Sequence, residues 1–209
     1  MSEARTKAGL ARAASHALGR AAAAKRSAAI AVAARLIRER TDAIVAANAR
    51  DMERSRKAGM PAPLLDRLML DAKRLDGIAS SLEEISRQDD PLGCVSWGRT
   101  LDSGVRVERV SVPMGVVAMI YEARPNVTAD AFGLCVRSGN ACVLKGGSAA
   151  RESCLALVAC CRDALVEVGL PADAVQYVDD DVEHTQTSEL VHATGLVDVL
   201  IPRGGASLI

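Results

Sequence analysis

The sequence predicts an α/β protein in which a Rossmann-like parallel sheet with crossover helices follows an α-helical N-terminal segment. Residues 2–88 carry apolar side chains at the spacing of amphipathic helices. After Pro91 and Gly93 the pattern changes, and short valine-rich stretches take turns with helix-like ones. Strands that alternate with helices are typical of a parallel sheet whose strands are joined by crossover helices. We therefore expect a helical segment over residues 1–92 and an α/β core over residues 93–209.

The helical segment is predicted from a long periodic stretch and from the residues that interrupt it. Apolar residues recur near one helical face at Ile30, Ala34, Ile37, Ile44 and Val45. Thr41 and Asp42 are expected to cap a second helix, and Gly59 is expected to end it. Pro61 and Pro63 then interrupt the pattern before "LLDRLMLDAKRLDGIASSLEEIS" resumes it. We interpret this segment as a packing layer without a chemical role.

The N-terminal stretch allows a second interpretation. Residues 4–38 contain no acidic residue and many alanines, arginines and serines, a composition typical of an organelle transit peptide. The helical interpretation is favoured because the periodicity continues without a break of the kind that marks a cleavage site. The longest uncharged run here, residues 27–34, is far too short to cross a bilayer, and we expect no membrane association.

The bulk composition argues against several classes of partner and site. Lysine plus arginine and aspartate plus glutamate number 26 each, so the net charge is zero. Binding to nucleic acid needs a basic surface and is not expected. The six cysteines form no CxxC pair and the three histidines do not cluster with them, so no metal site is expected. The irregularly spaced thiols are interpreted as reduced, which predicts a cytoplasmic protein.

The α/β core is predicted one element at a time. A strand over residues 105–112 is expected to bend at Pro113 and to lead into a buried strand over residues 116–120. The later elements are helices over 127–137 and 149–168, strands over 141–145, 174–178 and 196–201, and a short helix between the last two strands.

Unusual residues follow three of these strands. They form the segments "YEARPNVTAD" (121–130), "LKGGSAARE" (144–152) and "IPRGGASLI" (201–209). Ligands of open parallel sheets bind beyond the carboxyl ends of the strands. The three segments are therefore expected to contain the ligand-binding residues of the chain.

The second and third segments share a pattern of strand, cation, Gly-Gly, small residue and helix. Glycines let a ligand approach the backbone, and a helix N-terminus offers free N–H groups and a positive dipole end. A phosphate suits such a turn, with Lys145 or Arg203 as added charge. The alternative is a tight turn that only needs glycine, with a solvated cation at the strand end. Neither segment contains GxGxxG or GxxxxGK[ST], so the pattern leaves both interpretations open.

The first segment, residues 121–130, also allows more than one interpretation. Asn126 follows Pro125 and precedes a predicted helix, so its side chain can cap that helix, which the pattern alone favours. Alternatively, its amide donates a hydrogen bond to a developing oxyanion. Glu122 and Arg124 can form a weak surface pair, or Arg124 can hold an anionic substrate.

Together these segments resemble the gamma-glutamyl phosphate reductase (glutamate-5-semialdehyde dehydrogenase) family, a branch of the aldehyde dehydrogenase superfamily. The similar strings are "VPMGVVAMIYEARPNVTADAFGLCVRSGNACVLKGGSAARES", "AANARDME", "GLPADAVQYV" and "LVDVLIPRGGASLI". They run in the family's order over the whole chain, and "YEARPNVT" and "IPRGGA" are specific to this branch. The resemblance covers only the first half of the family's length. It thus implies an incomplete aldehyde dehydrogenase-like nucleotide-binding domain, with the catalytic domain outside this chain.

The resemblance also implies an oxidoreductase of proline biosynthesis. The family uses NADPH to reduce gamma-glutamyl phosphate to glutamate 5-semialdehyde and phosphate. A cysteine thiolate expels the phosphate, and hydride then reduces the resulting thioester. Members of the family are expected to be cytoplasmic homo-oligomers.

Several roles follow from the resemblance, residue by residue. Asn126 matches the oxyanion asparagine of the superfamily, and Lys145 matches the lysine that reaches the adenine ribose. Ser148 stands where NAD-preferring relatives often keep a glutamate, and a serine leaves room for the 2′-phosphate that a carboxylate would repel. The two Gly-Gly turns match the cofactor-binding loops; their residues are Gly146, Gly147, Gly204 and Gly205. Ser207 departs from the glycine that relatives commonly have.

Two further residues are our own expectation and are not part of the resemblance. Arg124 and Arg203 follow predicted strands, and we expect them to contact the charged groups of the substrate.

The nucleophilic cysteine of the family lies in a later segment that matches no residue of this sequence. The cysteines of the predicted core are interpreted as buried packing thiols, namely Cys135, Cys142, Cys154, Cys160 and Cys161. A reactive thiol needs an electropositive, partly exposed setting. We therefore expect the chain to be inactive by itself, with Leu208 and Ile209 beginning a helix.

Two alternative functions remain at this stage. The chain can be a truncated, non-catalytic module that binds a nucleotide or a partner. It can also act on another acyl phosphate or aldehyde within the superfamily, although the string "YEARPNVT" argues against that.

Overall fold

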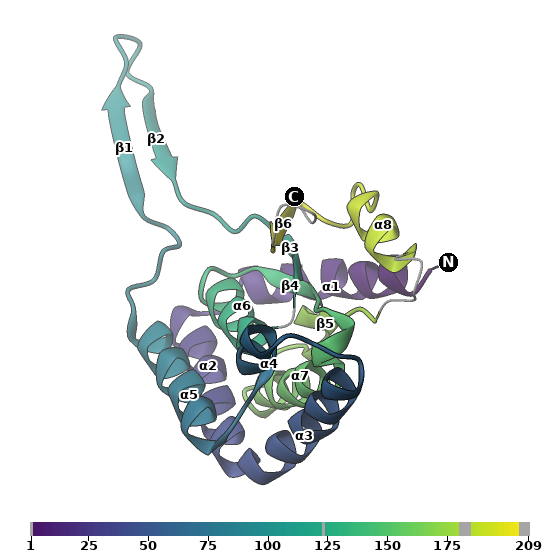
Figure 1. Cartoon of the computed structure of the whole chain (residues 1–209). Coiled ribbons are helices and arrows are strands. Elements are labelled where there is room, and N and C mark those ends of the chain that lie inside the picture. Colours follow the sequence, from purple (N-terminus) through teal and green to yellow (C-terminus); the bar gives the residue numbers. More distant parts are fainter. Residues whose placement is uncertain (1, 123, 180–184, 205–209) are drawn as a thin grey trace.

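Figure 1 shows the computed structural model of the chain, which describes residues 2–122, 124–179 and 185–204. The predicted helical N-terminal segment is confirmed. Its helices are α1 (Glu3–Gly19), α2 (Ala23–Glu39), α3 (Thr41–Lys57), α4 (Ala62–Leu68) and α5 (Ala72–Arg87). Among the described residues, every helix is too short or too polar to span a membrane.

The predicted cap at the start of α3 is wrong. Arg40 is the residue before the helix, and no side chain caps its N-terminus. The Thr41 hydroxyl instead donates to the carbonyl oxygens of Ile37 and Arg38, in the last turn of α2. Because α2 runs almost directly into α3, the threonine satisfies the end of one helix and does not cap the next.

An antiparallel hairpin links the helices to the sheet and was only half predicted. Its strands are β1 (Val95–Thr100) and β2 (Arg106–Val110), and every residue in both is exposed. Figure 1 shows the hairpin projecting from the rest of the molecule. The sequence predicted a strand near β2 but none at β1, because "VSWGRT" has no buried face to impose alternation.

The predicted parallel sheet is confirmed. Its strands are β3 (Val116–Tyr121), β4 (Ala141–Lys145), β5 (Val175–Tyr177) and β6 (Val199–Arg203), in the order β5-β4-β3-β6. Almost all residues of β3, β4 and β5 are buried, as expected for strands covered on both faces. The connections include α6 (Asn126–Arg137), the short 3-10 helix η1 (Ser148–Ala150), α7 (Arg151–Glu167), the 3-10 helix η2 (Ala172–Ala174) and α8 (Thr185–Val191).

The last strand begins later than the sequence predicted. The N–H groups of Leu196 and Val197 donate to the carbonyl oxygen of Ala193, and Gly195 has a φ of +80°. These residues form a turn, so pairing with β3 begins at Val199. An apolar run by itself does not distinguish a tight turn from the strand that follows it.

Helix α1 packs against the sheet through small side chains. Its buried face consists mainly of Ala4, Ala8, Ala11 and Ala14, which recur three or four residues apart. This helix contacts β3, β4 and β5. Since alanine lets a helix approach a sheet closely, the alanine-rich composition serves the packing of the core.

Candidate substrate and cofactor site

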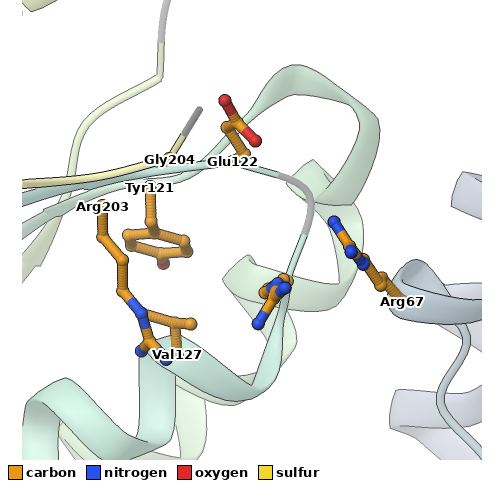
Figure 2. Close-up of a pocket in the computed structure, with 7 residues that line it drawn as sticks. Arg67, Tyr121, Glu122, Val127, Arg203 and Gly204 are labelled. Carbon is orange, nitrogen blue, oxygen red and sulfur yellow. The ribbon is translucent and has the colours of Figure 1, made fainter. Parts of the chain in front are cut away.

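The strand order places a crevice at the carboxyl ends of β3 and β6. The chain proceeds from β3 to β4 and β5, then returns to β6 on the other side of β3. Such a reversal leaves a crevice beyond the strand ends, where ligands of open α/β sheets bind. A cavity of about 310 Å³ lies there (Figure 2), lined by Arg67, Tyr121, Glu122, Arg124, Val127, Arg203 and Gly204.

Both arginines that we expected to contact substrate line this cavity. Arg124 follows β3, and Arg203 is the last residue of β6. The structure adds Arg67 from α4. Within the described residues, none of the three guanidinium groups forms an ion pair or a hydrogen bond. Their charges are therefore available to an anionic ligand.

Arg67 is a residue that the sequence did not identify. Nothing in "PLLDRLML" distinguishes it from any other arginine on a helix. Only the fold brings α4 to the ends of the strands. The helical segment is thus more than a packing layer, because it supplies part of the cavity wall.

Asn126 does not cap its helix. Pro125 precedes α6, and no side chain caps the N-terminus of that helix. The Asn126 side-chain amide instead donates to the Asp130 carboxylate, with Nδ2 and Oδ2 3.1 Å apart. An amide nitrogen has two hydrogens, so this bond leaves one N–H free to act as a donor.

A second cavity is lined by both Asn126 and Arg67. Its volume is about 420 Å³, and Arg67, Asn126 and Asp130 are among the lining residues. Burial raises the pKa of Asp130, while the hydrogen bond from Asn126 and the charge of Arg203 act in the opposite direction. Asn126 and Asp130 therefore lie in the same region as Arg67 and Arg203.

The Gly-Gly turn after β4 is closely packed. Lys145 pairs with Ile120 of β3, and its side chain is 7% exposed, so it is not the solvated cation of the alternative interpretation. A Cβ atom on Gly146 would lie 3.1 Å from Tyr177 Oη and 3.2 Å from both Cys154 Sγ and Tyr121 Cε2. Packing alone thus accounts for glycine at position 146.

The helix that follows this turn does not offer the free N–H groups that the sequence predicted. Asp51 from α3 accepts hydrogen bonds from the backbone N–H of Glu152 at 3.2 Å and of Ser153 at 2.8 Å. It also accepts one from the Ser153 hydroxyl at 2.7 Å. A buried carboxylate thus occupies the N-terminus of α7, where a phosphate was expected.

The outer part of the same turn remains accessible. Gly147 is partly buried and Ser148 is exposed. The guanidinium of Arg54 donates to the carbonyl oxygen of Ser148 at 3.1 Å. The same guanidinium is ion-paired with the buried Asp51 carboxylate. An arginine whose charge is shared with that carboxylate therefore lies beside the serine at which the resemblance implies a 2′-phosphate.

The final Gly-Gly turn is described only in part. Gly204 is exposed and lines the first cavity. Gly205, Ser207 and the helix expected at Leu208 and Ile209 lie outside the described residues.

The five core cysteines are buried, as predicted. Burial raises the pKa of Cys154 to about 11 and also raises the pKa values of Cys160 and Cys161. The pKa of Cys142 is raised by its hydrogen bond with Cys135 and by burial. Such thiols stay protonated near neutral pH, whereas a nucleophile must be a thiolate.

A family model and several solved structures match the chain. The model of the aldehyde dehydrogenase family matches residues 2–199. The chain is similar to gamma-glutamyl phosphate reductase from Thermotoga maritima, with 34% identity and a TM-score of 0.94 over 99% of this chain and 50% of that one. It is also similar to gamma-glutamyl phosphate reductase from Saccharomyces cerevisiae, with 28% identity and a TM-score of 0.90 over 100% of this chain and 53% of that one.

A more distant structure shares the fold. It is a probable aldehyde dehydrogenase from Listeria monocytogenes, at 16% identity and a TM-score of 0.75, over 99% of this chain and 42% of that one. The chain spans about half the length of the two reductases that it matches.

Proposed function

Because the chain belongs to the aldehyde dehydrogenase family, we propose that it supplies the cofactor site and part of the substrate site for the NADPH-dependent reduction of gamma-glutamyl phosphate. The products are glutamate 5-semialdehyde and phosphate, in proline biosynthesis. Similarity to two gamma-glutamyl phosphate reductases supports this substrate. The observation that carries the proposal is the cavity at the strand ends, where three arginines suit a phosphorylated substrate.

The loop after β4 fits NADPH. NADPH, when bound, supplies the hydride of the reaction. We assign Lys145, Gly146, Gly147 and Ser148 to cofactor binding, together with Gly204 and Gly205. The exposed hydroxyl of Ser148 suits a 2′-phosphate, as do the remaining N–H donors of nearby Arg54, which is also paired with Asp51. Since Asp51 occupies the N-terminus of α7, we expect that helix to hold no phosphate of the cofactor.

Asn126 is the proposed oxyanion donor. Its bond to Asp130 holds the amide in one orientation and leaves a second N–H for a developing negative charge. One such donor contributes on the order of 100- to 1,000-fold to a rate. Arg124 and Arg203 would bind the charged groups of the substrate beside it.

The nucleophile is proposed to lie outside this chain. The five core thiols are buried, and Cys94 is exposed but does not line the cavity. The thiolate of the family's nucleophilic cysteine, on a segment outside this sequence, would attack the acyl phosphate. We propose that the full enzyme is a cytoplasmic homo-oligomer, as the resemblance implies.

Titration of the chain with NADPH, followed by fluorescence of the reduced nicotinamide, tests the cofactor part. We expect binding, and we expect Lys145→Ala to weaken it by about 10- to 100-fold, as for the loss of a hydrogen bond to a charged group. Lys73→Ala, which removes an exposed lysine of α5, is the matched control. No NADPH binding by the folded chain would contradict the proposal.

The reverse reaction tests the catalytic part. It is the reduction of NADP⁺ in the presence of glutamate 5-semialdehyde and phosphate. The chain by itself is expected to show no turnover. Turnover would mean that one of its own thiols acts as the nucleophile, and Asn126→Ala should then reduce the rate without changing NADPH affinity.

A further inference from the structure

The cavity at the strand ends is charged on opposite sides. Figure 2 shows Arg203 on one side, reaching from β6, and Arg67 on the other, reaching from α4. The two residues are far apart in the sequence and belong to different layers of the fold. Because both line one cavity of about 310 Å³, a small ligand can contact both.

The residues that line this cavity carry an excess of positive charge. Three arginines and one glutamate line it. Elsewhere many arginines are paired with carboxylates, for example Arg12 with Asp198 and Arg26 with Asp90. Among the described residues, the three guanidinium groups form no hydrogen bond or ion pair, although the charge of Arg203 acts on the Asp130 carboxyl. Guanidinium groups that converge on one cavity in this way are typical of anion recognition.

We propose that Arg67 is a specificity-determining residue that binds one anionic end of a ligand whose other anionic end lies against Arg203. This inference rests on the proposed function, since it takes the cavity to be the substrate site. The ligand class is a short chain with a carboxylate at one end and a phosphoryl group at the other. A simple aldehyde or a monoanion would leave one side of the cavity unpaired.

The position of Arg67 also relates recognition to the reaction. Arg67 lines both the first cavity and the second one, and Asn126 also lines the second. An anion bound at Arg67 therefore fixes the ligand close to the proposed oxyanion donor. Positioning of this kind raises the reaction rate by orienting the ligand, and Arg67 itself takes no part in the chemistry.

Calorimetric titration of the chain with three probes tests the inference. The probes are 4-phosphonobutyrate, which is anionic at both ends, butyrate, which has only the carboxylate, and propylphosphonate, which has only the phosphonate. We expect the two-ended probe to bind about 10- to 100-fold more tightly than either single-ended one, since it makes one more charge-assisted contact.

Two variants locate that preference. Arg67→Gln should bind the two-ended probe about 10- to 100-fold more weakly. The single-ended probe whose anionic group lies against Arg203 should bind with little change. Arg67→Lys should recover part of the affinity. Arg56→Gln, which removes an exposed arginine of α3 that does not line the cavity, should bind every probe as the parent chain does. Far-UV circular dichroism checks that each variant is folded.

The outcomes separate this inference from the proposed function. A parent chain without preference for the two-ended probe, or an Arg67→Gln variant that keeps the preference, overturns the inference even if NADPH binds. A preference that Arg67→Gln abolishes supports the inference, and absent NADPH binding would then count against the proposed function alone.

Discussion

Gly146 shows how a residue expected at a ligand site can be required by packing. The side chains that surround it are Tyr121, Cys154 and Tyr177, and a Cβ atom would lie closer to all three than atoms normally pack. The same glycine matches a cofactor-binding loop. The packing explanation predicts that a methyl group added at position 146 lowers the stability of the chain even when no cofactor is bound.

The Gly146→Ala substitution is therefore expected to destabilise the chain. Overpacking of a closely packed site costs about 1–3 kcal/mol in the free energy of unfolding. Gly9→Ala, inside α1 where a Cβ atom meets nothing within 4 Å, is the control. It should raise the stability by about 0.5–1 kcal/mol through helix propensity.

Urea unfolding followed by far-UV circular dichroism measures both variants. If packing is the cause, the free energy of unfolding should fall for Gly146→Ala and rise for Gly9→Ala. A Gly146→Ala variant as stable as the parent would refute that explanation.

Helix α7 depends on a side chain from another helix. Asp51 of α3 is fully buried and accepts from two backbone N–H groups and one hydroxyl at the start of α7. The neighbouring Asn48 donates to the Leu68 carbonyl oxygen and to Ser153, and its own oxygen accepts from the Leu70 N–H. The string "AANARDME" thus joins α3 to α7 and to the end of α4.

Loss of this carboxylate should affect both stability and the cofactor loop. Asp51→Ala leaves buried donors without an acceptor, which costs about 2–4 kcal/mol. Ser148 lies in η1, directly before α7, and Asp51 also holds the Arg54 guanidinium that contacts it. NADPH affinity should therefore fall as well. Denaturant unfolding and NADPH titration of the same preparation measure the two effects.

The exposed Glu53, on the same helix, offers the matched substitution. Within the part of the chain that the structure describes, its carboxylate pairs only with Lys57, so Glu53→Ala should change neither quantity noticeably. Equal effects of the two variants would mean that Asp51 does not hold the start of α7.

At the scale of the whole molecule, Asp198 joins the first helix to the sheet. Its carboxylate lies 2.7 Å from the guanidinium of Arg12 in α1 and accepts from the Val116 N–H of β3, also at 2.7 Å. The hydrogen bond from Arg12 and the one from Val116 lower the pKa of Asp198 below its ordinary 3.8. The folded state therefore favours the ionised carboxylate.

The sign of the pH effect follows from that shift. An acid whose pKa is lowered on folding stabilises the folded state at pH values above the unfolded pKa, near 3.8. This contribution is lost as the pH falls through the lower pKa of the folded state. Asp198→Asn should cost about 1 kcal/mol at neutral pH and should flatten the acid limb of the stability curve. Urea unfolding at a series of pH values tests this, with the exposed Asp102→Asn in the hairpin turn as the control.

The sequence predicted the parts of this molecule that local pattern controls. Valine-rich runs located β3 and β4 closely, because buried parallel strands must be continuously apolar. The strand ends identified Arg124, Asn126 and Arg203 as candidates. Long-range contacts were not predictable: nothing local shows that Asp51 occupies the start of α7 or that α4 carries Arg67 to the cavity.

The exposed hairpin has a consequence for how the molecule is observed. Trp97 is the only tryptophan of the chain, and it lies on β1 with 48% of its surface exposed, beside Arg99. Its emission therefore reports the surroundings of a projecting ribbon and not those of the sheet. A fluorescence change marks an event at the hairpin, such as contact with another surface, while the core can melt without a matching signal.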